Sequence, residues 1–98
     1  HDYSINENLF HWQSQSTTAV DSPTGQRYIH HRERGSKVLL FVREFKADRI
    51  TGSAAAYTFL GTANYVKHDG SRPMNITWQL DRPIPAKFLK KTNKLVVG

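Results

Sequence analysis

The chain contains no cysteine, which excludes a disulfide framework and a thiolate metal site. This absence agrees with a reducing compartment, and we expect a cytoplasmic location. No apolar run approaches the roughly 20 residues that a membrane-spanning helix needs, and the first residues lack the pattern of a signal peptide. Because the chain begins with His1 instead of methionine, we expect it to be a piece of a longer protein.

Acidic residues are scarce. The 98 residues carry 8 acidic against 14 Lys and Arg side chains, which gives a net charge of +6. A basic chain of this kind is typical of a nucleic-acid binder, but the same charge also serves simple solubility in a small domain. The length fits one domain over residues 1–98, with a modest core.

Alternation of apolar and polar residues predicts a mainly β domain, a small sandwich or barrel of about five or six short strands. The expected strands cover residues 9–17, 26–31, 38–43, 57–67, 73–80 and 95–97. Turns are expected at 21–25, 32–36 and 68–71, and a short helix at 86–91 led by a proline. Residues 1–8 form a polar entry segment, and the apolar run 38–43 indicates a central strand.

Two of these strands carry more detail. Residues 73–80 place Met74, Ile76, Trp78 and Leu80 on one face, so we expect all four in the core. In residues 57–67, alternation places Tyr57, Phe59, Gly61, Ala63 and Tyr65 on one face, so the small Gly61 and Ala63 stand between aromatics. They leave a hollow on that face or allow a tight bend as the sheet closes.

The segment Phe10-His-Trp-Gln-Ser-Gln15 is the first candidate for a binding site. Trp12 offers a stacking surface, and Gln13, Ser14 and Gln15 offer donors and acceptors, a combination that suits the face and edge of a nucleobase. A core tryptophan with a wet outer face explains the same pattern. A wider set extends this candidate: the aromatics Trp12, Tyr28, Tyr57 and Tyr65, and the amide of Asn64.

Catalytic and metal-binding signals are weak. Glu44-Phe45-Lys46 matches part of a nuclease motif, but the match is common by chance and its acidic partners, Asp21 or Asp48, are not fixed by the sequence. His30 and His31 point to opposite faces of a strand, so they do not share a metal easily, and His11 is isolated from them. We therefore expect no enzyme activity in this domain, no metal and no cofactor.

Several stretches together resemble a bacterial family of unknown function. They are Phe10-His-Trp-Gln-Ser-Gln15, Leu40-Phe-Val-Arg43, Tyr57-Thr-Phe-Leu-Gly61, Pro73-Met-Asn-Ile-Thr-Trp78 and Pro83-Ile-Pro85. The resemblance covers about Leu9 to Pro85. That family is found at the C-terminus of superfamily II helicases, which often begin with a phospholipase-D-like nuclease domain.

The resemblance implies a function. Such architectures resemble type IV, modification-dependent restriction enzymes, in which a C-terminal β-barrel similar to SRA and PUA-like domains reads modified cytosine. It implies double-stranded DNA with 5-methylcytosine or 5-hydroxymethylcytosine as partner, base flipping, and helicase and nuclease domains in the same chain. SRA pockets hold an aspartate against the cytosine amino group. None of the matching stretches contains an acid, so a loop residue such as Asp21 or Asp48 would have to supply the carboxylate.

These expectations assign roles to particular side chains. Trp12 and Tyr57 frame the base, while Gln13, Ser14 and Gln15 read its edge. Phosphates are expected at Arg27, Arg43, Lys87, Lys90 and Lys91. The alternatives are a non-specific single-strand or RNA binder and a module that only docks on the helicase.

Overall fold

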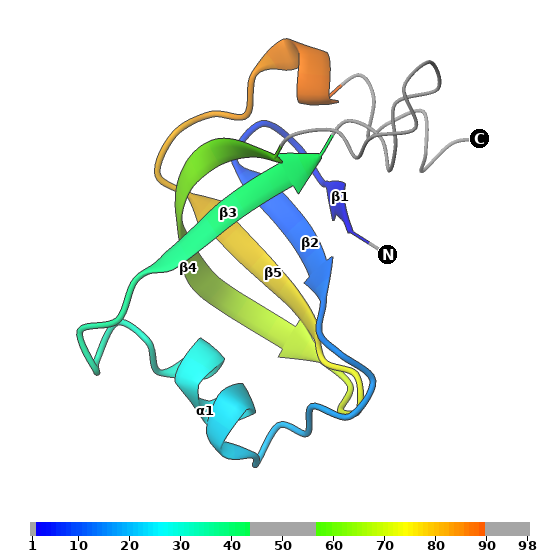
Figure 1. Cartoon of the computed structure of the whole chain (residues 1–98), viewed down its shortest axis with the longest axis vertical. Helices are drawn as coiled ribbons and strands as arrows, with labels where there is room; N and C mark the ends of the chain where they lie inside the picture. Colours follow the sequence, from blue (N-terminus) through cyan, green and yellow to red (C-terminus); the bar gives the residue numbers. More distant parts are fainter. Residues whose placement is uncertain (1, 44–56, 90–98) are drawn as a thin grey trace.

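The computed structural model describes residues 2–43 and 57–89. Five strands form one sheet whose neighbours are all antiparallel, in the order β1-β2-β5-β4-β3. The elements are β1 (Tyr3–Ser4), β2 (Leu9–Gln13), α1 (Pro23–Ile29), β3 (Val38–Arg43), β4 (Tyr57–Asp69) and β5 (Asn75–Leu80). The sheet curls into a half-barrel, with α1 at one end of the molecule and a helical turn at 86–89 at the other (Figure 1). The predicted class, a small mainly β barrel-like domain, is confirmed.

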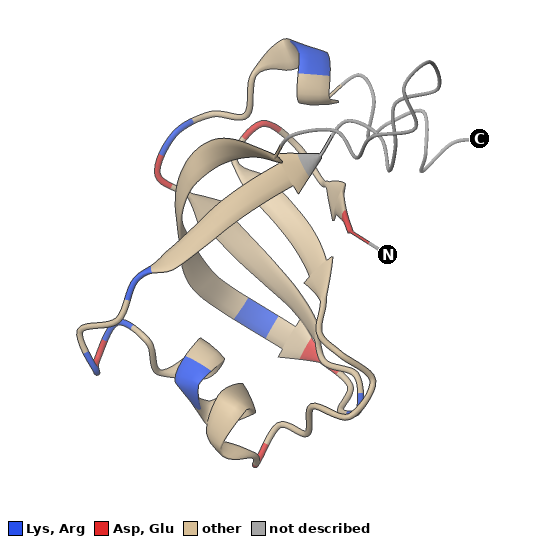
Figure 2. Cartoon of the chain, viewed as in Figure 1, with Lys and Arg blue, Asp and Glu red and all other residues tan. Residues whose placement is uncertain are grey.

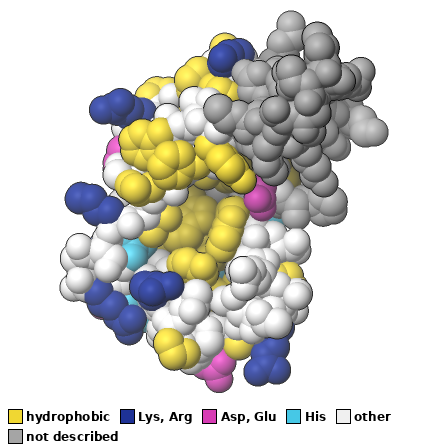
Figure 3. All heavy atoms as spheres, viewed as in Figure 1, with side chains coloured by type: hydrophobic (Ala, Val, Ile, Leu, Met, Phe, Trp, Pro, Cys, Tyr) yellow, Lys and Arg dark blue, Asp and Glu magenta, His cyan; other side chains and the backbone are white. Residues whose placement is uncertain are grey.

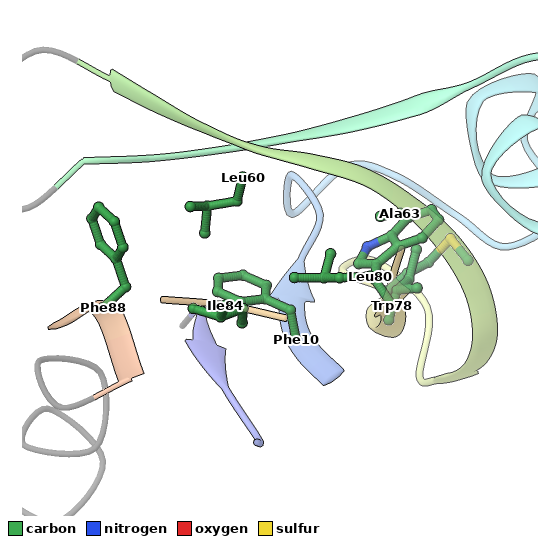
Figure 4. Packing of buried hydrophobic residues seen from close by; sticks show 9 residues of the cluster. Phe10, Leu60, Ala63, Trp78, Leu80, Ile84 and Phe88 are labelled. Carbon is green, nitrogen blue, oxygen red and sulfur yellow. The ribbon is translucent and has the colours of Figure 1, made fainter. Parts of the chain in front are cut away.

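The core lies on the concave side of the sheet and follows the predicted alternation of β5. Met74 and Ile76 have no exposed surface, and Trp78 and Leu80 are 4% and 5% exposed. Side chains from β2, β4 and the chain after β5 extend this core, with Phe88, Leu60 and Ile84 toward one end and Ala63 beside Trp78 at the other (Figure 4). The helix expected at 86–91 is present as a turn at 86–89, whose Phe88 belongs to the core and whose Leu89 packs against it.

Two β-bulges in β4 bend the sheet. On β4, Leu60 is an extra residue, since Leu40 pairs with Gly61 and the next pair is Phe41 with Phe59. Gly61 has a φ of 113°, a conformation that favours glycine, so the predicted bend at this residue is confirmed. Val66 is a second extra residue, between the pairs Tyr65–Trp78 and Lys67–Thr77. The face assignment predicted across 57–67 is therefore wrong, because each bulge reverses the alternation.

The predicted strand at 26–31 is wrong, because this segment belongs to helix α1 and the turn after it. The Oγ of Ser22 caps the helix by accepting a hydrogen bond from the Gly25 N–H at 3.0 Å, and Pro23 occupies the first turn. A Cβ on Gly25 would lie 2.3 Å from the carbonyl oxygen of Ala19. Only glycine therefore lets α1 approach the preceding loop this closely.

Other predicted boundaries differ in smaller ways. The strand expected over 9–17 ends at Gln13, β4 extends to Asp69 through part of the predicted turn, and the entry segment contributes β1. The segment 38–43 is a strand with the predicted bounds, but in the sheet formed by the described residues it is an edge strand and not a central one. Its apolar residues Leu39 and Phe41 are about half exposed on the outer face. None of the described helices is long and apolar enough to span a membrane.

Several expectations fall outside the described residues. They are the strand at 95–97, the Glu44-Phe45-Lys46 motif, Asp48, Lys90 and Lys91.

Candidate nucleic-acid interface

A hollow with an apolar floor opens on the concave face of the sheet (Figure 3). In the matching view of Figure 1, it lies over β5, between β3 and α1. Lys and Arg side chains lie around its α1 side, whereas its floor is hydrophobic. A concave apolar surface with charged groups at its margin is the usual form of a ligand site.

Four aromatic side chains form what we call the aromatic wall: Trp12 of β2, Tyr28 of α1, Trp78 of β5 and Tyr65 of β4. Tyr28 meets Trp12 edge-on at 5.3 Å between ring centroids and Trp78 at 6.2 Å. Tyr65 meets Trp78 at 6.4 Å, also edge-on. This edge-to-face geometry is favourable for aromatic pairs.

The members of the aromatic wall differ in exposure. Trp78 is buried, but Trp12, Tyr28 and Tyr65 are only partly buried. The three rings on strands point to the same face because of the strand register. Trp12 pairs with Ile76 of β5, and Trp78 of β5 pairs with both Phe10 and Tyr65. The partly exposed rings can therefore offer apolar surface to a planar ligand on the concave side.

A hydrogen-bonded pair adds polar atoms to this wall. The Tyr65 hydroxyl lies 2.7 Å from Nδ1 of His68, and the ring centroids are 6.1 Å apart. Burial raises the pKa of the Tyr65 hydroxyl above its usual value of 10.0, because ionisation would place a charge in a poorly solvated position. The hydroxyl therefore stays protonated at neutral pH.

His31 fastens the loop after α1 to β4. It is 2% exposed, its Nδ1–H donates to the carbonyl of Ser36 at 3.0 Å, and its Nε2 accepts from the Tyr65 N–H at 3.1 Å. Its ring also packs 5.8 Å from that of Trp78. Both ring nitrogens are engaged in these bonds, so His31 acts as a structural link and not as the metal ligand considered from the sequence.

Four exposed cations follow one another on α1 and on the loop to β3, and we call them the basic rim: Arg27, Arg32, Arg34 and Lys37. The single acid among them, Glu33, lies 3.1 Å from Nδ1 of His30. Arg32 also donates from Nη2 to the carbonyl of Tyr65 at 3.2 Å, which places its guanidinium beside the aromatic wall. Figure 2 shows these basic positions on α1 and its following loop. The rim is thus an electropositive margin next to a stacking surface.

The model of one family, described as a domain of unknown function (DUF3427), matches residues 1–92, which include every residue of the aromatic wall and the basic rim. The chain belongs to the DUF3427 family. Neither the curated proteins nor the solved structures contain a significant match to it.

In the DUF3427 chain, the predicted base-reading residues do not gather around Trp12. Ser14 is buried, and its Oγ accepts from the Met74 N–H at 2.9 Å and donates to the carbonyl of Gln15 at 3.0 Å. Gln13 alternates with Trp12 and is exposed, and its Nε2 donates to Asn75 Oδ1 at 3.3 Å. Gln15 is exposed beyond the end of β2. The Ser14 hydroxyl, which was expected to read a base edge, instead links the end of β2 to Met74, the residue before β5.

The structure also separates Trp12 from Tyr57. Trp12 pairs with Ile76, and Ile76 pairs with His68. Tyr57 stands eleven positions before His68, which corresponds to about 36 Å along an extended strand. It is 62% exposed at the other end of β4. Two rings so far apart are not positioned to frame one base. The tyrosine of β4 that packs against Trp78 in the aromatic wall is Tyr65, not Tyr57.

The residues predicted to contact phosphates also lie at different ends of the molecule. Arg27 belongs to the basic rim. Lys87 lies at the opposite end of the molecule, where its Nζ sits 5.0 Å from the centre of the Phe88 ring (Figure 2). Arg43 is the last residue of β3, and its side chain is outside the described part.

One acid in the DUF3427 chain is held by a defined set of donors. Asp81 accepts hydrogen bonds from the hydroxyl of Thr62 and, at 2.9 Å, from Nδ2 of Asn64. These bonds, with a smaller contribution from Lys37, lower the pKa of Asp81 below its usual 3.8. The amide of Asn64, expected to read a base edge, is thus engaged. Among the described residues, no three His, Asp or Glu side chains are grouped as a metal site requires.

Proposed function

We propose that this DUF3427 chain is a DNA-reading module that receives an unpaired base against the aromatic wall while the basic rim contacts phosphates. The observation that supports this most directly is the placement of partly exposed aromatic rings on a concave face that is flanked by a run of four exposed cations, of which Arg32 contacts the carbonyl of Tyr65. Base stacking on aromatics needs no particular sequence, and cations along its margin follow the backbone.

Modified cytosine is the base we favour, on the strength of the family resemblance. Flipping a base costs a few kcal/mol, and stacking on aromatic rings returns about 1–3 kcal/mol per base. A 5-methyl group adds burial worth on the order of 1 kcal/mol, or about fivefold in affinity. Discrimination above this value requires that the wall enforce shape.

The biological setting belongs to the same proposal. The module has no catalytic role of its own, and it directs helicase and nuclease domains of its parent protein, an ATP-dependent restriction enzyme, to modified DNA in the cytoplasm. A chain of this charge favours binding to DNA, because its Lys and Arg side chains displace the counterions condensed on the DNA phosphates.

The test is binding of the 98-residue chain to matched duplexes, one unmodified and the others with 5-methylcytosine or 5-hydroxymethylcytosine, at several salt concentrations. Four phosphate contacts predict a slope of log K against log salt of about −3 to −4. Arg27→Gln and Arg34→Gln should each reduce that slope by about one. Arg82→Gln, an exposed cation near the other end of the sheet, is the control and should leave it unchanged.

Other outcomes would redirect the proposal. Equal binding to all duplexes leaves a non-specific nucleic-acid binder, and no binding rejects DNA reading. Binding whose salt slope responds equally to Arg27→Gln and Arg82→Gln would show that the basic rim is not the contact surface.

A protein-docking module is the second candidate, favoured by the outer face of β3 and β4. Leu39, Phe41, Tyr57 and Phe59 are each 50–62% exposed there, and the rings of Phe41 and Phe59 lie 5.1 Å apart. Exposed apolar groups of this kind often mark an interface. Phe41→Gln with Phe59→Gln should then weaken association with the remainder of the parent protein and leave DNA binding intact.

A further inference from the structure

The bulge at Val66 brings two polar residues of β4 onto the same face. In a regular strand, residues three positions apart point to opposite faces. Here Tyr65 pairs with Trp78 and His68 pairs with Ile76, because Val66 is left without a partner between them. Both residues consequently share the concave face with the aromatic wall, while Val66 is 46% exposed. Bulges often re-aim side chains beside functional sites.

The surroundings of Tyr65 hold it in place. Its N–H donates to His31, its carbonyl accepts from Arg32, and its ring rests edge-on against Trp78. Its hydroxyl is bonded to Nδ1 of His68. A side chain fixed by backbone bonds on both sides and by packing is pre-organised, which is what a reading group requires.

The pair can present a donor and an acceptor together. If the Tyr65 hydroxyl donates to Nδ1, its oxygen can accept from a ligand and Nε2–H of His68 can donate. If Nδ1–H donates instead, the hydroxyl can donate to the ligand and Nε2 can accept. In the described part of the chain, only Nδ1 of this imidazole is engaged. Either arrangement matches a base edge that has a donor beside an acceptor, as cytosine does.

We infer that Tyr65 and His68 are the groups that read the hydrogen-bonding edge of the base, in the role that the sequence assigned to Gln13, Ser14 and Gln15. This inference rests on the proposed DNA-reading function and specifies its site. The ligand class is an unpaired base whose edge combines an amine donor with a carbonyl or ring-nitrogen acceptor. Arg32 links the site to the basic rim, since the carbonyl it binds belongs to Tyr65.

The test uses Tyr65→Phe, which keeps the ring, and His68→Gln, which keeps polarity. The chain also offers a matched control pair, because Tyr3 stacks on His11 at 4.5 Å at the far edge of the sheet. We expect Tyr65→Phe and His68→Gln each to weaken binding to the 5-methylcytosine duplex roughly 3- to 10-fold, the effect of one hydrogen bond. Tyr3→Phe and His11→Gln should stay within about twofold of the unsubstituted chain.

The readout includes the ratio of affinities for the 5-methylcytosine duplex and the same duplex with an abasic site at that position. The two duplexes share their phosphates and differ in the base edge, so losing an edge-reading group lowers this ratio, whereas a loss of stability alone does not change it. Circular dichroism melting identifies any variant that fails to fold, and the other variant of the pair then decides. If the unsubstituted chain shows a ratio of one, the proposed function fails and this inference fails with it. If the unsubstituted chain discriminates and both Tyr65→Phe and His68→Gln keep its ratio, the inference alone is wrong and the proposed function stands.

Discussion

Replacement of His31 by alanine should destabilise the domain far more than replacement of its neighbour His30. His31 is 2% exposed, and its two ring nitrogens satisfy the Ser36 carbonyl and the Tyr65 N–H. Each polar group left without a partner costs about 1–3 kcal/mol, so the two losses together amount to roughly 2–6 kcal/mol. Removal of the imidazole ring from beside Trp78 also leaves a cavity, which lowers the free energy of unfolding further.

This loss is large for a small domain, whose total free energy of unfolding is about 5–15 kcal/mol. At about 4–8 °C per kcal/mol, the melting temperature should fall by at least about 8 °C. His30 is the matched control, because its side chain is 38% exposed and its ionic contact among the described residues is to Glu33, which is 76% exposed. Such an exposed pair contributes about 0–1 kcal/mol.

The assay is urea unfolding followed by tryptophan fluorescence, since Trp78 lies against His31 and reports on the transition. A second expectation follows from position: His31→Ala should also weaken DNA binding, because it releases the loop that carries Arg32 from β4. Equal unfolding midpoints for His31→Ala and His30→Ala would refute the reasoning. That result would mean that the loop is held to β4 by other contacts.

Three further predictions follow from individual contacts. Ser14→Ala should lower the free energy of unfolding by about 1–3 kcal/mol in urea titrations, because the buried N–H of Met74 loses its acceptor. An unchanged midpoint would contradict this link. Gly25→Ala should abolish the helical signal of α1 or prevent folding, as judged by circular dichroism, since its Cβ would collide with backbone oxygens. The folded pKa of Asp81 lies below 3.8, so its stabilising effect is present above about pH 4 and is lost as pH falls through the folded pKa. Asp81→Asn should therefore reduce the loss of stability between pH 5 and pH 2, in melts compared across that range, and an identical acid limb would contradict this.

The sequence was most informative where one face of a strand is buried. In β5, apolar residues at every second position correctly predicted the buried set, because a half-buried strand in a curled sheet leaves no other arrangement. The same reasoning failed for β3, whose apolar residues on both faces indicated a central strand. Leu39 and Phe41 are instead exposed at the sheet edge. The pattern of residues along a strand shows that a face is apolar, but it does not show whether other parts of the chain cover that face.

The errors that matter most for the site have two physical origins. A helix of seven residues is too short for its periodicity to be recognised, and Ser22-Pro23 begins either a turn or a helix. Bulges leave no mark in an alternating pattern, so Tyr65 and His68 could not be placed on one face from spacing alone. The separation of Trp12 from Tyr57 depends on strand order and register, which the sequence does not specify. The sequence left Trp12 between a stacking surface and the core, and in the structure it is partly buried and packs against the core.

The segment that was predicted incorrectly is the one that completes the candidate site. As a strand, residues 26–31 would have placed Arg27 and Ile29 opposite Tyr28 and contributed one more sheet edge. As a helix with its loop, the segment covers one end of the concave face. It places Tyr28 between Trp12 and Trp78 and carries the four cations of the basic rim to the same margin. Natural sequences tend to depart from regular patterns where function requires it. The short helix and the bulge at Val66 both bring side chains to the concave face, whereas the bulge at Leu60 lies beside the outer pair Phe41 and Phe59. Because two independent irregularities place aromatic, polar and basic groups on the concave face, we favour it as the functional surface over the apolar outer face of β3 and β4.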